Sequence, residues 1–183
     1  MNRTKSFITS PLGVFAVVLI LIMGLSMSAT AQNENPDDFN LVKLGDVVPN
    51  FDIKTIDGNR FNIEDYRGKT VLLNFFATWC PPCVKELPEL EKQIWLEFKD
   101  KDFTVLVIGR GHNKKEVKQY RNKKNYSFPM APDKDKAIYE KFFTKYIPRN
   151  VVINKEGKII YLEHGYTEEE FGKLIKLIEE ELY

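Results

Sequence analysis

Two cysteines separated by two prolines constrain the fold of this chain more than any other feature. Cys80 and Cys83 are the only cysteines among its 183 residues. The apolar run 71–76 before them predicts a central strand that is covered on both faces. Apolar residues at three- and four-residue steps after them predict a helix, and Pro88 predicts a kink in it. The pair therefore lies where a buried strand passes into a helix.

This position of the two cysteines favours redox chemistry. A sulfur at a helix N-terminus meets unpaired amides and the positive end of the helix dipole, which both favour a thiolate. The second sulfur, one helical turn later, is able to reach the first. An inert bridge is a weaker interpretation, because so short a loop constrains little of the unfolded chain. A zinc site is also weaker, because His112 and His164 do not have zinc-finger spacing.

The N-terminus has the layout of a secretory signal peptide. Arg3 and Lys5 precede the apolar run 12–25, and the small residues of 26–31 end in an Ala-x-Ala pattern. The apolar run is shorter than the ~20 residues that a membrane-spanning helix needs. We expect residues 1–31 to be a cleaved signal peptide, with retention as an N-terminal membrane anchor as the alternative. Both outcomes predict a periplasmic or otherwise extracytoplasmic location.

The rest of the chain is expected to form one domain. Residues 32–44 are mostly polar and predict a linker, so the folded domain is expected to span 45–183. A hydrophobic content of 43% is enough for a buried core. Lys plus Arg number 27 against 26 Asp plus Glu, which argues against a nucleic-acid partner because such proteins need a basic excess.

Hydrophobic periodicity predicts an α/β sandwich with a mixed sheet. Alternating residues around Asp57-Gly58 predict a β-hairpin over 51–63, and a tight loop predicts a second hairpin over 151–162. The other predicted elements are a strand at 103–108 and helices at about 113–125, 134–143 and 167–182.

Several segments resemble one known family. They are Gly45–Phe51, Tyr66–Lys69, Asn74–Cys83, Ile147–Asn154 and Gly157–Ile159. Over residues 45–183 the chain resembles the TlpA/ResA-type extracytoplasmic thioredoxin-like thiol-disulfide oxidoreductases. The resemblance implies a thioredoxin fold, in which helices flank a mixed central sheet. It also implies an N-terminal β-hairpin and a helical insertion between the β-α-β half and the β-β-α half.

The resemblance also implies roles for the residues around the motif. Cys80 corresponds to the attacking cysteine and Cys83 to the resolving cysteine. Pro148 corresponds to the cis-proline that faces the disulfide in this fold. The backbone of Ile147 is then expected to pair with an extended substrate segment, as in strand addition. Trp79 is expected to cover the disulfide and to contact the substrate.

Three further positions bear on the mechanism. Thioredoxin carries a buried aspartate where this chain has Asn74, which cannot take a proton. Glu86 matches the acidic residue that follows the second cysteine by three positions in the family, and a buried carboxylate there would have a raised pKa and accept the Cys83 proton. An exposed glutamate that favours the helix dipole is the alternative. Arg149 stands directly after Pro148, where the family frequently has threonine. Its side chain is either a solvated surface cation or a charge beside the disulfide, and the sequence does not decide between the two.

These inferences predict an exported protein thiol-disulfide oxidoreductase that reduces disulfides of other exported proteins without a cofactor or a metal. The family implies a membrane thiol carrier as its reductant. A disulfide-forming oxidant is one alternative. A metal-binding chaperone of the same fold is another, although such chaperones resemble Cys-x-x-x-Cys and this chain has two intervening residues. A thiol peroxidase would be expected to show Thr-x-x-Cys, and Thr78 is one residue too close to Cys80.

Overall fold

The computed structural model describes residues 35–183. The predicted signal segment 1–31 therefore lies outside the described residues. Among residues 35–183, no helix is both long enough and apolar enough to cross a membrane.

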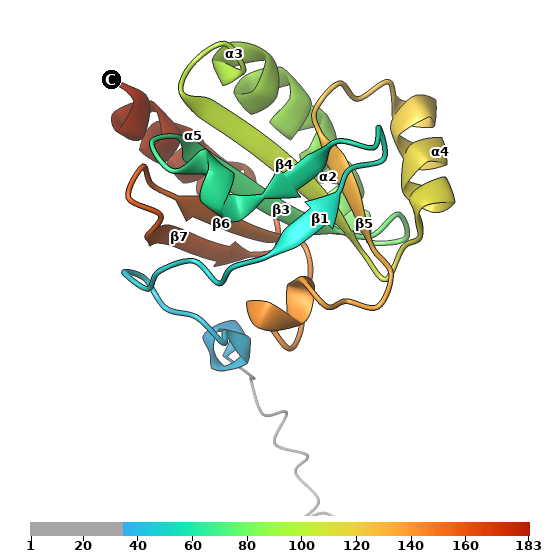
Figure 1. Ribbon diagram of the computed structural model, residues 1–183, viewed down its shortest axis with the longest axis horizontal. Coiled ribbons are helices and arrows are strands. Elements are labelled where there is room, and N and C mark those ends of the chain that lie inside the picture. Colours follow the sequence, from blue (N-terminus) through green and yellow to red (C-terminus); the bar gives the residue numbers. More distant parts are fainter. Residues whose placement is uncertain (1–34) are drawn as a thin grey trace, which may run out of the picture. The chain divides into compact units, whose positions relative to one another are not determined.

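A five-stranded mixed sheet forms the centre of the described domain (Figure 1). Its strand order is β5-β4-β3-β6-β7, in which β3, β4 and β5 are parallel and β6 and β7 are antiparallel to their neighbours. The predicted central strand is confirmed, because every residue of β3 is buried. The bounds are β3 Thr70–Phe76, β4 Phe103–Arg110, β5 Met130–Asp133, β6 Arg149–Ile153 and β7 Ile159–His164.

Helices α2, α4 and α5 lie near their predicted positions, at Pro81–Glu89, Lys114–Lys124 and Glu168–Leu182. The helix that follows the cysteines continues after α2 as the π-helical η3 (Leu90–Trp95) and the short α3 (Leu96–Phe98). Pro88 lies just before this irregular stretch and has no N–H to continue the regular hydrogen bonding. The predicted perturbation of the helix therefore takes the form of π-helical turns.

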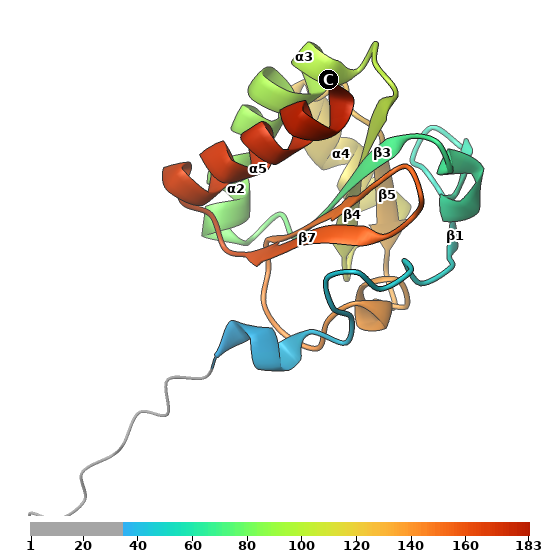
Figure 2. The same cartoon turned by 90° about the vertical axis from the view of Figure 1, so that its left-hand side faces the viewer.

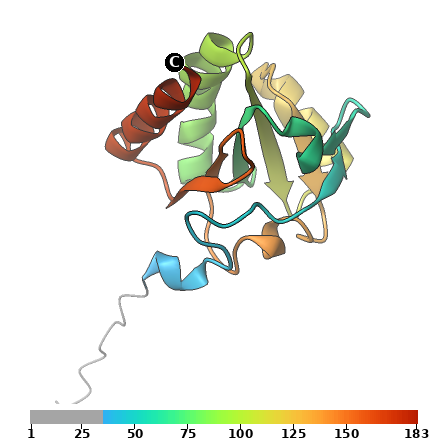
Figure 3. The same cartoon turned by 60° about the vertical axis from the view of Figure 1, so that its left-hand side comes forward.

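The two faces of the sheet pack against different layers (Figures 2 and 3). On one side, here called the helical face, α2, η3, α3 and α5 cover a core that includes Leu72, Phe76 and Val152. On the other side, here called the N-terminal face, the first residues of the domain, the hairpin and the segment 138–143 cover a core that includes Leu73 and Phe75. The hairpin consists of β1 (Asp52–Lys54) and β2 (Arg60–Asn62), which pair antiparallel as predicted.

The predicted helix at 134–143 is wrong. Only the single 3-10 turn η4 (Tyr139–Lys141) is helical there, and Lys136 has a positive φ of 61°. The Asp133 carboxylate accepts the N–H groups of Ile138 and Tyr139, so it stabilises a turn in place of a helix. Strand β5 was not predicted, because its Pro132 disfavours a strand except at a sheet edge, which is where β5 lies.

The part of the predicted linker that the structure describes is packed against the domain. Residues Pro36–Phe39 form the 3-10 helix η1. The Leu41 N–H donates to the Phe142 carbonyl at 2.8 Å, and Val42 is buried in the core of the N-terminal face. The folded domain therefore begins before Gly45, because apolar residues in this polar segment have partners on the N-terminal face.

Candidate active site

The cysteine pair lies at the start of α2, as the sequence predicts. Cys80 is the N-cap residue, and its sulfur forms a disulfide with Cys83. Both residues are buried, with exposed fractions of 3% for Cys80 and 0% for Cys83. The Cys83 N–H points to the Cys80 sulfur at 3.3 Å, whereas Pro81 and Pro82 have no N–H to offer. In the first turn of α2, a single backbone N–H, that of Cys83, therefore points to the Cys80 sulfur.

The predicted recognition loop lies against this disulfide. The Ile147–Pro148 peptide bond is cis, as the family resemblance implies. The Ile147 carbonyl oxygen lies 3.7 Å from the Cys80 sulfur. The Tyr139 hydroxyl donates to the carbonyl oxygen of Tyr146 at 2.6 Å, which supports the loop from the N-terminal face. The fold thus joins two segments that are 67 residues apart in the chain.

Glu86 is a buried residue of α2, the helix that carries the cysteines. Its exposed fraction is 1%, so the alternative of an exposed glutamate is wrong. The side-chain amides of Asn74 and Asn150 donate to its two carboxyl oxygens, at 3.0 Å and 2.5 Å. Burial raises the pKa of Glu86 to about 7, and the two amide hydrogen bonds offset part of that rise. Glu86 is therefore able to exchange a proton near neutral pH.

Asn74 and Asn150 form one polar unit with Glu86. The two asparagines lie directly opposite each other on β3 and β6, and Asn74 Nδ2 donates to Asn150 Oδ1 at 2.9 Å. Asn74 Oδ1 is buried and has no hydrogen-bond partner within the described residues. Sequence reasoning singled out Asn74 and Glu86 but missed Asn150. A polar residue directly before the apolar run Val151–Ile153, in a strand that is buried throughout, was the signal that pointed to it.

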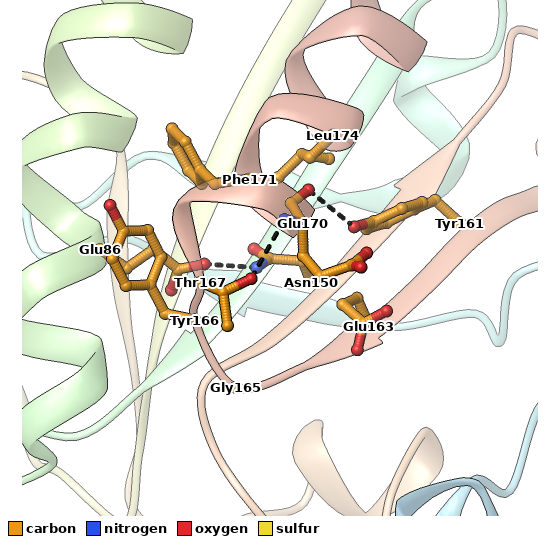
Figure 4. Close-up of a pocket in the computed structure, with 10 residues that line it drawn as sticks. All are labelled: Glu86, Asn150, Tyr161, Glu163, Gly165, Tyr166, Thr167, Glu170, Phe171 and Leu174. Carbon is orange, nitrogen blue, oxygen red and sulfur yellow. Dashed lines mark hydrogen bonds between the residues drawn. The ribbon is translucent and has the colours of Figure 1, made fainter.

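A small cavity connects this polar unit with the loop between β7 and α5 (Figure 4). It is partly open and measures about 10 Å³, which is close to the space that one water molecule needs. Figure 4 shows Glu86 joined to Asn150 by a hydrogen bond, with Thr167 and Glu170 at the start of α5 among the other lining residues. The remaining lining residues are Tyr161, Glu163, Gly165, Tyr166, Thr167, Glu170, Phe171 and Leu174. Glu86 thus has an approach that does not pass through the disulfide.

Trp79 and Arg149 lie in opposite environments, one exposed and one buried. Trp79 is 67% exposed, so its ring projects into solvent and is not packed into a core. Arg149 is 1% exposed, and the interpretation as a solvated cation is wrong. Its guanidinium donates to the carbonyl oxygens of Pro36 and Lys145 and to the side chain of Asn40, all on the N-terminal face.

The two histidines have separate partners within the described residues. His112 accepts a hydrogen bond from the Thr78 N–H at 3.0 Å, and His164 lies beside Glu163. Within residues 35–183, no three side chains of His, Cys, Asp or Glu are grouped so that they could hold a metal ion.

Comparison with known proteins agrees with this geometry. A family model described as Redoxin matches residues 43–178. The chain belongs to the Redoxin family. It is similar to the thiol-disulfide oxidoreductase ResA of Bacillus cereus, with 28% identity over 166 residues that cover 90% of this chain and 95% of that one. ResA of Bacillus subtilis is 28% identical over 147 residues, which cover 80% of this chain and 82% of that one.

A solved structure extends the likeness from sequence to fold. A Bacteroides thetaiotaomicron protein described as a protein disulfide isomerase superposes with a TM-score of 0.76 and is 37% identical. The match covers 79% of this chain and 92% of that one. The TlpA/ResA-type resemblance and the thioredoxin fold are confirmed. This Redoxin-family chain is a thiol-disulfide oxidoreductase, and Cys80 and Cys83 fit its redox-active centre.

Proposed function

We propose that the protein reduces disulfides of other exported proteins. The Cys80 thiolate attacks a substrate disulfide, forms a mixed disulfide and releases one substrate thiolate. Cys83 then attacks the Cys80 sulfur, which closes the Cys80–Cys83 disulfide and releases the second substrate thiolate. Two electrons pass from the dithiol to the substrate. The observation that carries this order is that Cys80 lies beside the Ile147 carbonyl, whereas Cys83 is fully buried.

The reducing direction is supported by the few donors around Cys80. A strong oxidant stabilises its reduced form, and a well-stabilised attacking thiolate contributes to that. Here the Cys83 amide points to the Cys80 sulfur, while Pro81 and Pro82 lack N–H groups. We expect a potential nearer the ~−270 mV of thioredoxin than the ~−120 mV of the oxidant DsbA.

Glu86 takes part in the second step of this mechanism. It follows Cys83 by three positions on one helix, a spacing that places neighbours on one helix face. A carboxylate with a pKa of about 7 accepts the proton that Cys83 must lose before it attacks. The cavity beside Asn150 then lets Glu86 return that proton to solvent without opening the disulfide site.

The location and partners follow from the N-terminal pattern and the family. The basic, apolar and small-residue segments of 1–31 favour export, by a cleaved signal or by a retained anchor. An exported reductase has no direct access to cytoplasmic reductants, so its disulfide must be reduced again by a membrane thiol carrier. Exported proteins that contain disulfides are the substrates, and their contact surface includes Trp79, Ile147 and Pro148.

Trapping the mixed disulfide tests this function. A Cys83→Ala chain cannot resolve its mixed disulfides, so it is expected to accumulate covalent adducts with exported proteins. A Cys80→Ala chain, expressed at the same level, serves as the matched control and should form none. Adducts in the control, or trapped partners confined to cytoplasmic proteins, would contradict the proposal.

The reduction potential tests the direction of electron flow separately. Equilibration with glutathione gives the potential of the Cys80–Cys83 pair in the purified domain. A value above about −150 mV would make the protein an oxidant and overturn the reductase assignment. Such a potential would still be consistent with a thiol-disulfide oxidoreductase.

A further inference from the structure

His112 lies beside the redox motif although it is distant from it in sequence. It occupies the short turn between β4 and α4, and its exposed fraction is 7%. The ring packs near Phe76 at the end of β3, with 6.2 Å between ring centroids. Its Nε2 atom accepts the Thr78 N–H at 3.0 Å. The imidazole therefore links the α4 side of the fold to the segment that enters the cysteine motif.

The hydrogen bond to Thr78 holds the turn that carries the motif. The Cys80 N–H donates to the Ala77 carbonyl at 3.1 Å, so Thr78 and Trp79 are the two central residues of that turn. The Thr78 N–H has its partner in His112, a side chain from another element. The direction in which Trp79 projects and the way in which Cys80 enters α2 depend on this turn.

The neighbours of His112 prepare its ring for this hydrogen bond. Glu116 Oε2 lies 3.6 Å from Nδ1 and favours the tautomer with its hydrogen on Nδ1, which leaves Nε2 free to accept. The capping box of α4 holds the carboxylate in place, because the Asn113 N–H donates to the same oxygen at 2.7 Å. Gly109 makes room, since a Cβ there would lie 2.7 Å from the Val117 side chain and 3.3 Å from His112 Cβ.

We propose that His112 is a positioning residue of the redox motif. Its neutral imidazole, oriented by Glu116, holds the Thr78 amide and so presents Trp79 and Cys80 to the substrate. The proposal rests on the thiol-disulfide chemistry of the chain and is independent of the direction of electron flow and of the natural substrate.

A pair of substitutions tests the role in the attack. His112→Leu has no acceptor, and it is expected to slow the reaction of the reduced protein with a small aromatic disulfide about tenfold at neutral pH. His112→Gln places an amide oxygen near the position of Nε2 and is expected to restore the rate to within about twofold.

The fluorescence of Trp79 reports the turn directly. In a Trp95→Phe background, the emission spectrum of Trp79 is expected to change in the His112→Leu chain and to be restored in the His112→Gln chain, which again offers an acceptor to the Thr78 N–H. Urea unfolding of each variant controls for a general loss of structure.

Three results would overturn the proposal. One is an equal loss of rate in His112→Leu and His112→Gln, which would indicate a purely structural role. Another is an unchanged rate of reaction with the small disulfide in a His112→Leu variant that circular dichroism shows to be folded. The third is a Trp79 emission spectrum that is the same with His112 and with His112→Leu. A small disulfide is the probe throughout, so a failure of the reductase assignment does not affect these outcomes.

Discussion

Glu86 and Arg149 are both charged residues with an exposed fraction of only 1%, but they lie on opposite faces of the same sheet. Glu86 on the helical face contacts the side-chain amides of Asn74 and Asn150. Arg149 directly precedes Asn150 on β6, and successive side chains of a strand point to opposite faces. On the N-terminal face, the guanidinium donates to backbone carbonyl oxygens and to Asn40, and it lies over the Phe143 ring.

The difference between the two sets of partners decides which group is able to change its charge. Amide donors stabilise a carboxylate only in part, so burial still raises the pKa of Glu86 to about 7. Carbonyl oxygens accept and never donate, so they stabilise only the charged form of Arg149. Burial lowers the pKa of Arg149, but an arginine remains protonated in proteins. Burial thus produces a titrating group beside the cysteines and a permanent charge on the other face.

The largest expected effect comes from removing the permanent charge. Arg149→Met keeps an unbranched apolar stem but leaves the carbonyl oxygens of Pro36 and Lys145 without their buried donor. We expect the free energy of unfolding to fall by roughly 3–4 kcal/mol, measured by urea denaturation. Arg60→Met is the matched control, because Arg60 pairs with Asp52 at an exposed site and such pairs contribute about 0–1 kcal/mol. Equal losses in the two variants would contradict the structural role of Arg149.

The second effect is the contribution of Glu86 to the pH dependence of stability. Its pKa is raised in the folded state, so between about pH 4.5 and pH 7 the folded protein binds more protons than the unfolded chain. The free energy of unfolding should therefore fall as the pH rises through this window, by about 3 kcal/mol, and should level off above it. Subtracting the curve of Glu86→Gln isolates this contribution. Parallel curves for the two proteins would show that Glu86 does not titrate in this range.

Sequence reasoning found the titrating group and missed the permanent one for a physical reason. Glu86 shares a helix with Cys83, and local spacing together with the family motif identifies it. Two partners of Arg149, Pro36 and Asn40, lie more than 100 residues away in chain order, in a segment whose polar composition predicts a linker. Nothing local in the sequence shows that Arg149 and Asn40 meet.

The same distinction separates the predicted elements of the fold from the missed ones. The apolar patterns of strand β3 and helix α5 predict both elements from the local sequence. Strand β5 contains a proline and is a strand because it pairs with β4, and the turn at η4 replaces a helix because the Asp133 carboxylate accepts two amides. Interactions of this kind depend on tertiary contacts, which composition and periodicity do not encode.

A smaller effect, on rate, tests whether the titration of Glu86 serves catalysis. Glu86→Gln removes the proton acceptor, so resolution of the mixed disulfide by Cys83 should slow about tenfold at pH 7, at the low end of general-base effects. The initial attack by Cys80 should keep its rate, which single-turnover kinetics with a labelled disulfide peptide can separate from resolution. Glu97→Gln, at an exposed position further along the helix, is the control. An unchanged resolution rate across pH 5 to 9 would limit Glu86 to a structural role.

The smallest expected effect tests whether the N-terminal segment depends on Arg149. Asn40→Ala removes the side-chain oxygen that accepts from Arg149 Nη1 at 3.0 Å. Its loss should lower the free energy of unfolding by about 1 kcal/mol. The Arg149→Met background provides the control, because the acceptor has already lost its donor there and Asn40→Ala should cost close to nothing. The difference between the two costs is the coupling energy of the pair. If Asn40→Ala costs the same in both backgrounds, the segment is held by its apolar contacts, and Arg149 serves the carbonyl oxygens alone.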